Sequence, residues 1–162
     1  MVADIKIKFN TINATNYLKK ISRNTPRAIK QSLARVSAYG VKQITEKTQK
    51  GQSPDGGGFQ GYASSTKKSR RKKRRQTSFV DLTDTGQMFR SLAWANRGYK
   101  NILFFRRNTE NKKAAYHDFF GAGKSKVIRP FFSIGKKDEV QMQKRFAQHF
   151  FRLTGIRWVN EK

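Results

Sequence analysis

A run of basic side chains is the part of this sequence with the clearest chemistry. Residues 67–75 read Lys-Lys-Ser-Arg-Arg-Lys-Lys-Arg-Arg, and we call this segment the basic run. Ammonium and guanidinium groups bind phosphates and carboxylates, but charges without a rigid scaffold do not discriminate bases. The run therefore predicts contact with a nucleic-acid backbone or an acidic protein surface. The residues expected to make it are Lys67, Lys68, Arg70, Arg71, Lys72, Lys73, Arg74 and Arg75.

The net charge extends this argument to the whole chain. There are 36 Lys and Arg residues against 10 Asp and Glu, a formal charge of +26. Removing the 8 basic residues of the run from the 36 leaves 28 against 10, which is still +18. A compact domain with this charge repels itself, so we expect an acidic partner, with nucleic acid as one candidate. The alternative for the run itself is a solvated arm that only raises solubility.

Residue types that could support catalysis are sparse. His117 and Asp118 form the only adjacent acid–base pair, and neighbours in a helix do not face each other. The absence of Cys and the scattered acids predict no metal site. The glycine-rich residues 51–62 lack the Gly-Lys-Ser/Thr ending and the preceding strand of a phosphate-binding loop. We therefore expect no enzyme activity, no metal and no cofactor.

The length of 162 residues suits a single domain over residues 1–162. No run of 18 apolar residues and no apolar leader near Met1 occurs, so neither a membrane span nor a secretory signal is expected. The absence of Cys fits assembly in a reducing cytoplasm.

Periodicity predicts the elements of the first half. Val2 to Phe9 alternates as a half-buried strand does, and residues 13–22 favour a short helix. Thr25 and Pro26 predict the start of a second, long helix that ends near Gly51. Residues 51–78 are then expected to form a flexible, exposed Gly-rich and basic loop, in which a helix begun at residues 63–66 continues into the basic run.

A short helix is predicted within the stretch of residues 82–92. Asp84 or Thr85 is expected to cap it, Gly86 to let the backbone pack closely, and Leu92 to lie with Met88 and Phe89 on its apolar side. The other elements expected from the sequence are strands at 91–96 and 101–107, a polar turn at 108–113, a helical turn stopped by Gly121, an extended segment at 127–130, a final helix from Asp138 to Gly155, and a terminal strand or docking segment with Ile156, Trp158 and Val159.

These elements predict an α+β fold. A long N-terminal helix and a C-terminal helix would pack on a small antiparallel sheet, and the basic loop would stay exposed. His149 lies in the aromatic-rich final helix, where a core or surface role is expected rather than a ligand role.

Four segments, in this order, resemble the phage virion morphogenesis and tail-completion family. The first joins Ser53-Pro54-Asp55-Gly56 to Ser64-Ser65-Thr66-Lys67-Lys68, and the second is residues 82–92 with Asp84, Thr85, Gly86 and Leu92. The third runs from Tyr116 to Gly121, and the fourth contains Arg129, Pro130 and Phe131 ahead of a C-terminal helix. In the fourth, Val127 and Ile128 stand where the family usually has Pro.

The resemblance implies a structural virion protein without a cofactor. Proteins of this family form rings, commonly of six identical subunits, at the neck or tail end of tailed bacteriophages. It implies partners among the neck and tail proteins (connector, tail terminator or tail tube), genomic DNA in the lumen, no membrane, and assembly in the host cytoplasm. The alternative that the residues themselves leave open is a non-specific nucleic-acid-binding protein without a virion role.

Overall fold

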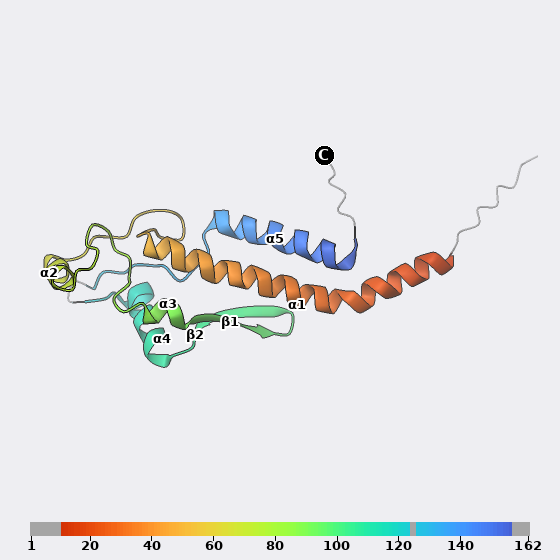
Figure 1. The fold of residues 1–162 in the computed structure, drawn as a ribbon, viewed down its shortest axis with the longest axis horizontal. Coiled ribbons are helices and arrows are strands. Elements are labelled where there is room, and N and C mark those ends of the chain that lie inside the picture. Colours follow the sequence, from red (N-terminus) through yellow and green to blue (C-terminus); the bar gives the residue numbers. More distant parts are fainter. Residues whose placement is uncertain (1–10, 124–125, 157–162) are drawn as a thin grey trace, which may run out of the picture.

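The computed structural model of the protein describes residues 11–123 and 126–156 (Figure 1). The fold is α+β, with helices and one two-stranded antiparallel sheet. The elements are α1 (Thr11–Gln49), α2 (Ser64–Lys72), α3 (Gln87–Ser91), β1 (Leu92–Arg97), β2 (Lys100–Phe105), α4 (Asn108–Ala115), a π-helical turn (Tyr116–Phe120) and α5 (Lys136–Thr154).

One continuous helix, α1, replaces the two helices expected before residue 51. Pro26 lies inside it, where its ring removes a backbone donor and bends the helix, as Figure 1 shows. The hydroxyl of Thr25 donates to the Ile21 carbonyl at 2.7 Å, so this residue does not cap a new helix. The predicted break is therefore wrong, because a proline kink and a helix start share the same local sequence.

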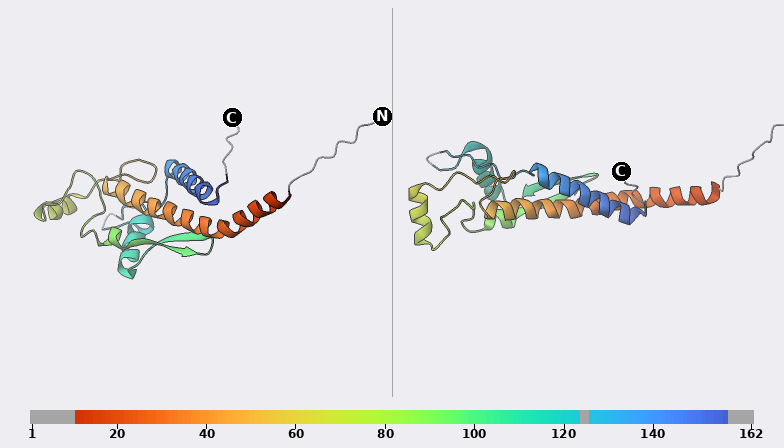
Figure 2. Two further views of the ribbon diagram at one scale, coloured as in Figure 1. Left: turned by 45° about the vertical axis from the view of Figure 1, so that its right-hand side comes forward. Right: turned by 90° about the horizontal axis from the view of Figure 1, so that it is seen from above.

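Helix α1 lies between α5 on one side and the hairpin of β1 and β2 on the other (Figures 1 and 2). Gly40 marks the point where these layers meet. A Cβ added there would lie 3.4 Å from Met142 of α5 and 3.6 Å from Leu103 of β2. The small residue lets both neighbours approach the helix backbone. The C-terminal helix thus packs along α1, and side chains of α5 and β2 both reach the helix at Gly40.

The hairpin confirms the expected pair of strands. β1 and β2 pair in antiparallel register from Leu92 opposite Phe105 to Arg97 opposite Lys100. Gly98 has φ +69°, which the tight turn between the strands requires. The sheet packs one face on α1 and leaves Ile102 and Phe104 exposed.

The hydrophobic core joins the hairpin to the helices around it. Phe131 is 1% exposed, and its ring meets Phe89 of α3 edge-on at 6.0 Å and Phe105 of β2 at 6.4 Å. The buried members of this core are Ile44, Met88, Phe89, Leu92, Phe105, Ala114 and Phe131. Met88 and Phe89 confirm the predicted apolar side of α3, whereas Leu92, expected on the same helix, is the first residue of β1.

The polar turn expected at residues 108–113 is wrong, because these residues form α4. Glu110 is buried and Lys113 donates to it at 2.8 Å, an i,i+3 pair that supports a helix. The π-helical turn follows without a break and ends at Gly121, as predicted. Gly121 has φ +80°, and a Cβ there would collide with the Lys126 carbonyl.

Helix α5 begins two residues before the expected start at Asp138. That residue is buried and forms an ion pair with Lys47 of α1, so its carboxylate ties the two helices together. Gly155 ends the helix with φ +72°, which confirms the predicted stop. Val140, expected on the apolar side, is 47% exposed instead.

Two expectations concern residues outside the described ranges. They are the N-terminal strand at residues 2–9 and the greater part of a terminal segment with Trp158 and Val159. Within the described ranges, no helix combines the length and apolarity that crossing a membrane requires.

Candidate nucleic-acid or acidic-partner interface

The basic run lies on α2 and the turn that follows it, at one end of the molecule (Figure 1). The helix begins at Ser64 and continues through Lys72, which confirms that the run extends a helix begun just before it. Lys73 and Arg74 then turn the chain, with backbone bonds to the carbonyls of Arg70 and Arg71 at 3.0 and 2.9 Å. The run therefore starts as a helix rather than as an irregular arm.

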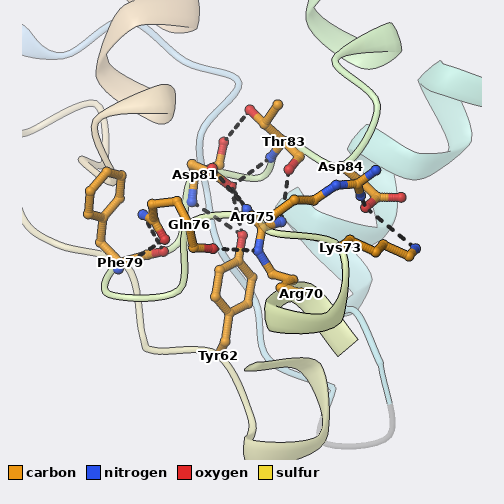
Figure 3. A network of polar contacts seen from close by, with 9 residues as sticks. All are labelled: Tyr62, Arg70, Lys73, Arg75, Gln76, Phe79, Asp81, Thr83 and Asp84. Carbon is orange, nitrogen blue, oxygen red and sulfur yellow. Dashed lines mark hydrogen bonds and ion pairs between the residues drawn. The ribbon is translucent and has the colours of Figure 1, made fainter. Parts of the chain in front are cut away.

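Arg70 anchors this segment to the rest of the chain (Figure 3). Its Nη2 donates to both carboxylate oxygens of Asp81, at 2.9 and 3.0 Å. Nε donates to the Gln76 carbonyl and Nη1 to the Thr83 carbonyl, each at 2.8 Å. The guanidinium also lies over the ring of Tyr62, 4.6 Å from its centroid. A planar, forked donor satisfies all these partners at once, which a lysine could not do.

The Asp81 carboxylate is the centre of the network. The hydroxyl of Tyr62 donates to it at 2.8 Å, and the backbone N–H of Thr83 donates to the same oxygen at 3.0 Å. Burial, followed by the hydrogen bond to Asp81, raises the pKa of Tyr62 to about 12, so the phenol keeps its proton and remains a donor. Arg70 is 7% exposed as a residue, so it cannot reach an external phosphate. The expectation that it binds a partner is wrong.

Asp84 holds the end of the basic run. It forms an ion pair with Arg75, and its Oδ1 lies 4.0 Å from Nζ of Lys73. Asp84 does not cap α3, although the sequence predicted that it would. The N-cap is Gly86 with φ +71°, and Thr85 Oγ1 accepts one long bond, 3.4 Å, from the Gln87 N–H. Gly86 is thus needed for its left-handed conformation rather than for close packing.

Five cations of the run remain available to a partner. Lys68, Arg71, Lys72 and Arg74 are exposed, and Lys67 is half-buried. Among the described residues, none of these five forms an ion pair. They are carried on a helix and a turn that Arg70 fixes in place, so they present a defined set of charges.

The other residues singled out in the sequence belong mainly to the scaffold. Leu92 and Phe131 are core residues, and Gly121 is required by its backbone conformation. Tyr116 is 58% exposed and stacks edge-on with Phe120, while Pro130 is exposed.

Arg129 connects the fourth motif to the glycine-rich loop. It is buried, and its guanidinium donates to the carbonyls of Gln60 and Gly61 at 3.2 and 3.4 Å. Burial lowers its pKa from the ordinary value. Asp118 Oδ1 accepts the N–H groups of Phe131 and Phe132 at 2.7 and 2.9 Å, so its carboxylate orders the adjoining strand-like segment.

The only adjacent acid–base pair therefore splits between two environments. Asp118 is engaged by backbone N–H groups, whereas Nδ1 of His117 is buried without a hydrogen-bond partner. Burial and then the positive charge of Arg129 lower the pKa of His117, which favours the neutral imidazole. His149 instead lies 3.1 Å from the hydroxyl of Ser32, with its pKa lowered by partial burial and by Arg152 and Arg35.

Sequence reasoning missed Tyr62, Asp81 and Thr83, which fix the basic run. The available signal was Asp81, an isolated acid shortly after a block of cations, since a buried Arg requires a carboxylate nearby. Within the described ranges, no group of three His, Asp or Glu side chains could hold a metal ion. The comparisons with known proteins give no match to a family, a curated protein or a solved structure.

Proposed function

We propose that this protein is a structural subunit of a tailed bacteriophage, one that forms a ring at the neck or tail end and completes the tail or joins it to the head. The observation that supports it most is the meeting of the four motif segments in space. Phe131 of the fourth packs on Phe89 of the second, and Asp118 of the third binds the Phe131 N–H. Arg129 ties the fourth to the loop of the first.

These contacts make the four short motifs a single framework. Phe131 and Phe89 belong to the same core, and Gln60 and Gly61, whose carbonyls Arg129 binds, lie between the two parts of the first motif. The resemblance therefore concerns one connected scaffold. The role that it implies is structural and needs no cofactor. Such a role agrees with a protein whose most distinctive chemical property is its positive charge.

An exposed aromatic surface fits the ring. Phe119 and Phe120 are each 67% exposed on the π-helical turn, beside the half-exposed Tyr116. Soluble monomers rarely leave such rings clustered in water, so this surface is suited to a neighbouring subunit. A closed ring uses two different patches, one from each neighbour. The ring size of six rests on the resemblance, and virion assembly would take place in the host cytoplasm.

Purified particles test the proposal. Immuno-electron microscopy and mass spectrometry of virions should find the protein at the neck or tail end, and analytical ultracentrifugation should find a closed oligomer. The variant F119S/F120S should shift the chain to monomer while it stays folded. Absence from intact particles would contradict the proposal.

The five available cations favour the second candidate, a non-specific nucleic-acid-binding protein. The structure indicates which residues to neutralise, because replacing the whole run would also remove Arg70 and unfold its network. The arm variant therefore changes Lys67, Lys68, Arg71, Lys72 and Arg74 to Gln. The charge-matched control changes Lys19, Lys20, Arg23, Arg27 and Lys30 to Gln.

The two candidates differ in what the arm variant loses. If DNA binding is the whole function, the arm variant should lose most duplex affinity and the slope of affinity with salt should fall by up to about five, roughly one for each contact removed. In the virion role, incorporation into particles should survive in part. Partial incorporation despite lost DNA binding would separate the roles.

A further inference from the structure

A cavity of about 360 Å³ opens where α3, the end of β2 and the start of α4 meet. It is lined by Gln87, Arg90, Ser91, Arg106 and Arg107, and we call this group the arginine cradle. Arg90 comes from α3, while Arg106 and Arg107 form the connection between β2 and α4. Of the described residues, none that lines the cavity is acidic.

The fold forces these three cations together. The Arg106 N–H donates to the Ser91 carbonyl at 2.8 Å, which extends the strand pairing by one step beyond Leu92 opposite Phe105. Arg90 therefore lies next in the chain to the residue that faces Arg106. Like charges gathered in this way raise the free energy of the folded chain unless an anion neutralises them.

The guanidinium groups keep unused donors. A guanidinium carries five N–H groups, and Arg90 donates one of them, from Nη2, to the Thr85 carbonyl at 2.7 Å. Among the described residues, none of the three arginines has an acidic partner. Helix α4 follows Arg107 directly, and among the described residues no side chain makes a capping hydrogen bond at its start, while the carboxylate of Glu110 in the first turn is paired with Lys113.

We propose that the arginine cradle binds a phosphate group. Forked guanidinium donors match the oxygens of a phosphate, and Gln87 adds an amide donor at the rim. The described residues that line the cavity include no aromatic ring, so they offer no stacking for a base and bind the phosphate alone. The phosphate comes either from a nucleic-acid backbone or from a free ion. This inference goes beyond the proposed function, since the cradle binds phosphate with or without a virion role.

The test titrates the full chain with inorganic pyrophosphate and, separately, with a short DNA duplex of arbitrary sequence. The cradle variant is R90Q/R106Q/R107Q, and the charge-matched control is R27Q/R97Q/K100Q, whose three positions are exposed away from the cavity. Calorimetry measures affinity, and circular dichroism checks that each variant is folded. The single variant R107Q keeps the bond between Arg90 and Thr85, and it provides a second measurement should the triple variant fold poorly.

The cradle variant should bind pyrophosphate at least about tenfold more weakly than the control variant does, the effect of losing more than one charged hydrogen bond. A matching loss of duplex affinity, with a salt slope smaller by about two to three, identifies a nucleic-acid backbone as the source. Duplex affinity unchanged beside lost pyrophosphate binding identifies a free phosphate. Equal weakening in the cradle and control variants, or no saturable pyrophosphate binding to the wild type, would overturn the inference. None of these readouts depends on where the protein lies in a particle.

Discussion

At the scale of single residues, two neighbouring arginines in the basic run have different roles, one structural and one available for binding. Arg70 is buried and engages a carboxylate and two carbonyls, while Arg71, the next residue, points to solvent. A composition-based description treats them as the same. The difference follows from helical geometry, because successive residues of a helix are rotated by about 100° about its axis. One side chain therefore faces the protein, and the next faces solvent, where a partner can bind it.

Arg70→Met should lower the free energy of unfolding by roughly 3 kcal/mol, because it leaves the partly buried Asp81 carboxylate without its cation. Arg71→Met should change it by no more than about 0.5 kcal/mol, as for exposed residues generally. Urea denaturation measures both. The affinity for duplex DNA should show the opposite order. Arg71→Met should weaken binding more than Arg70→Met, because it removes an available cation. Equal stability losses in the two variants would show that Arg70 is not an anchor.

At the scale of elements, the turn after α4 depends on one glycine. Gly121 has φ +80° and faces the Lys126 carbonyl so closely that a Cβ has no room. Gly123, two residues on, has φ +75° and nothing within 4 Å of an added Cβ. The two positions share a backbone conformation and differ only in the surrounding space.

Gly123→Ala should therefore cost about 1 to 2 kcal/mol, the strain of a left-handed residue with a side chain. Gly121→Ala should cost roughly 2 kcal/mol more, because the clash with backbone cannot be relieved by rotating a side chain. Thermal unfolding of the two variants checks the difference. Similar melting temperatures would mean that the turn relaxes around the methyl group.

An element can be predicted from the sequence when the residues that stabilise it lie close together along the chain. The hairpin was predicted because its strands and its Gly98-Tyr99 turn are encoded within the fourteen residues from Leu92 to Phe105. The unbroken α1 was not, since a proline after a threonine signals a helix start equally well. The anchoring of the basic run was also not predicted, because its cause is Asp81, which lies eleven residues from Arg70 and is invisible to periodicity.

The candidate site divides in the same way. Its charge was predictable from composition, and five of the eight cations proposed for partner binding remain free to act. The arginine cradle was not predictable, because Arg90 and Arg106 are brought together only by the pairing of β1 with β2. Motif residues such as Phe131 and Arg129 were recognised as a pattern, while their roles in the core and in loop anchoring required coordinates.

At the scale of the whole molecule, the net charge of +26 opposes the fold itself. Raising the ionic strength from about 0.01 M to about 0.15 M shortens the Debye length from about 30 Å to about 8 Å, which screens the repulsion between distant cations. The melting temperature of the isolated protein should therefore rise over this range, as differential scanning calorimetry can measure. The arm variant, with five fewer charges, should show a smaller rise. A melting temperature that falls with salt would mean that attractive ion pairs outweigh the repulsion.

The anchoring of α2 by Arg70 has a consequence for how a polyanion is met. A flexible basic tail loses conformational entropy when it binds, and that loss subtracts from each contact it makes. In this protein α2 is already ordered in the folded chain, because Arg70 bonds to Asp81 and to the carbonyls of Gln76 and Thr83. Little further conformational entropy is therefore lost on binding. The exposed cations on α2 are thus preorganised, and each should contribute more affinity than the same residue in an unstructured tail.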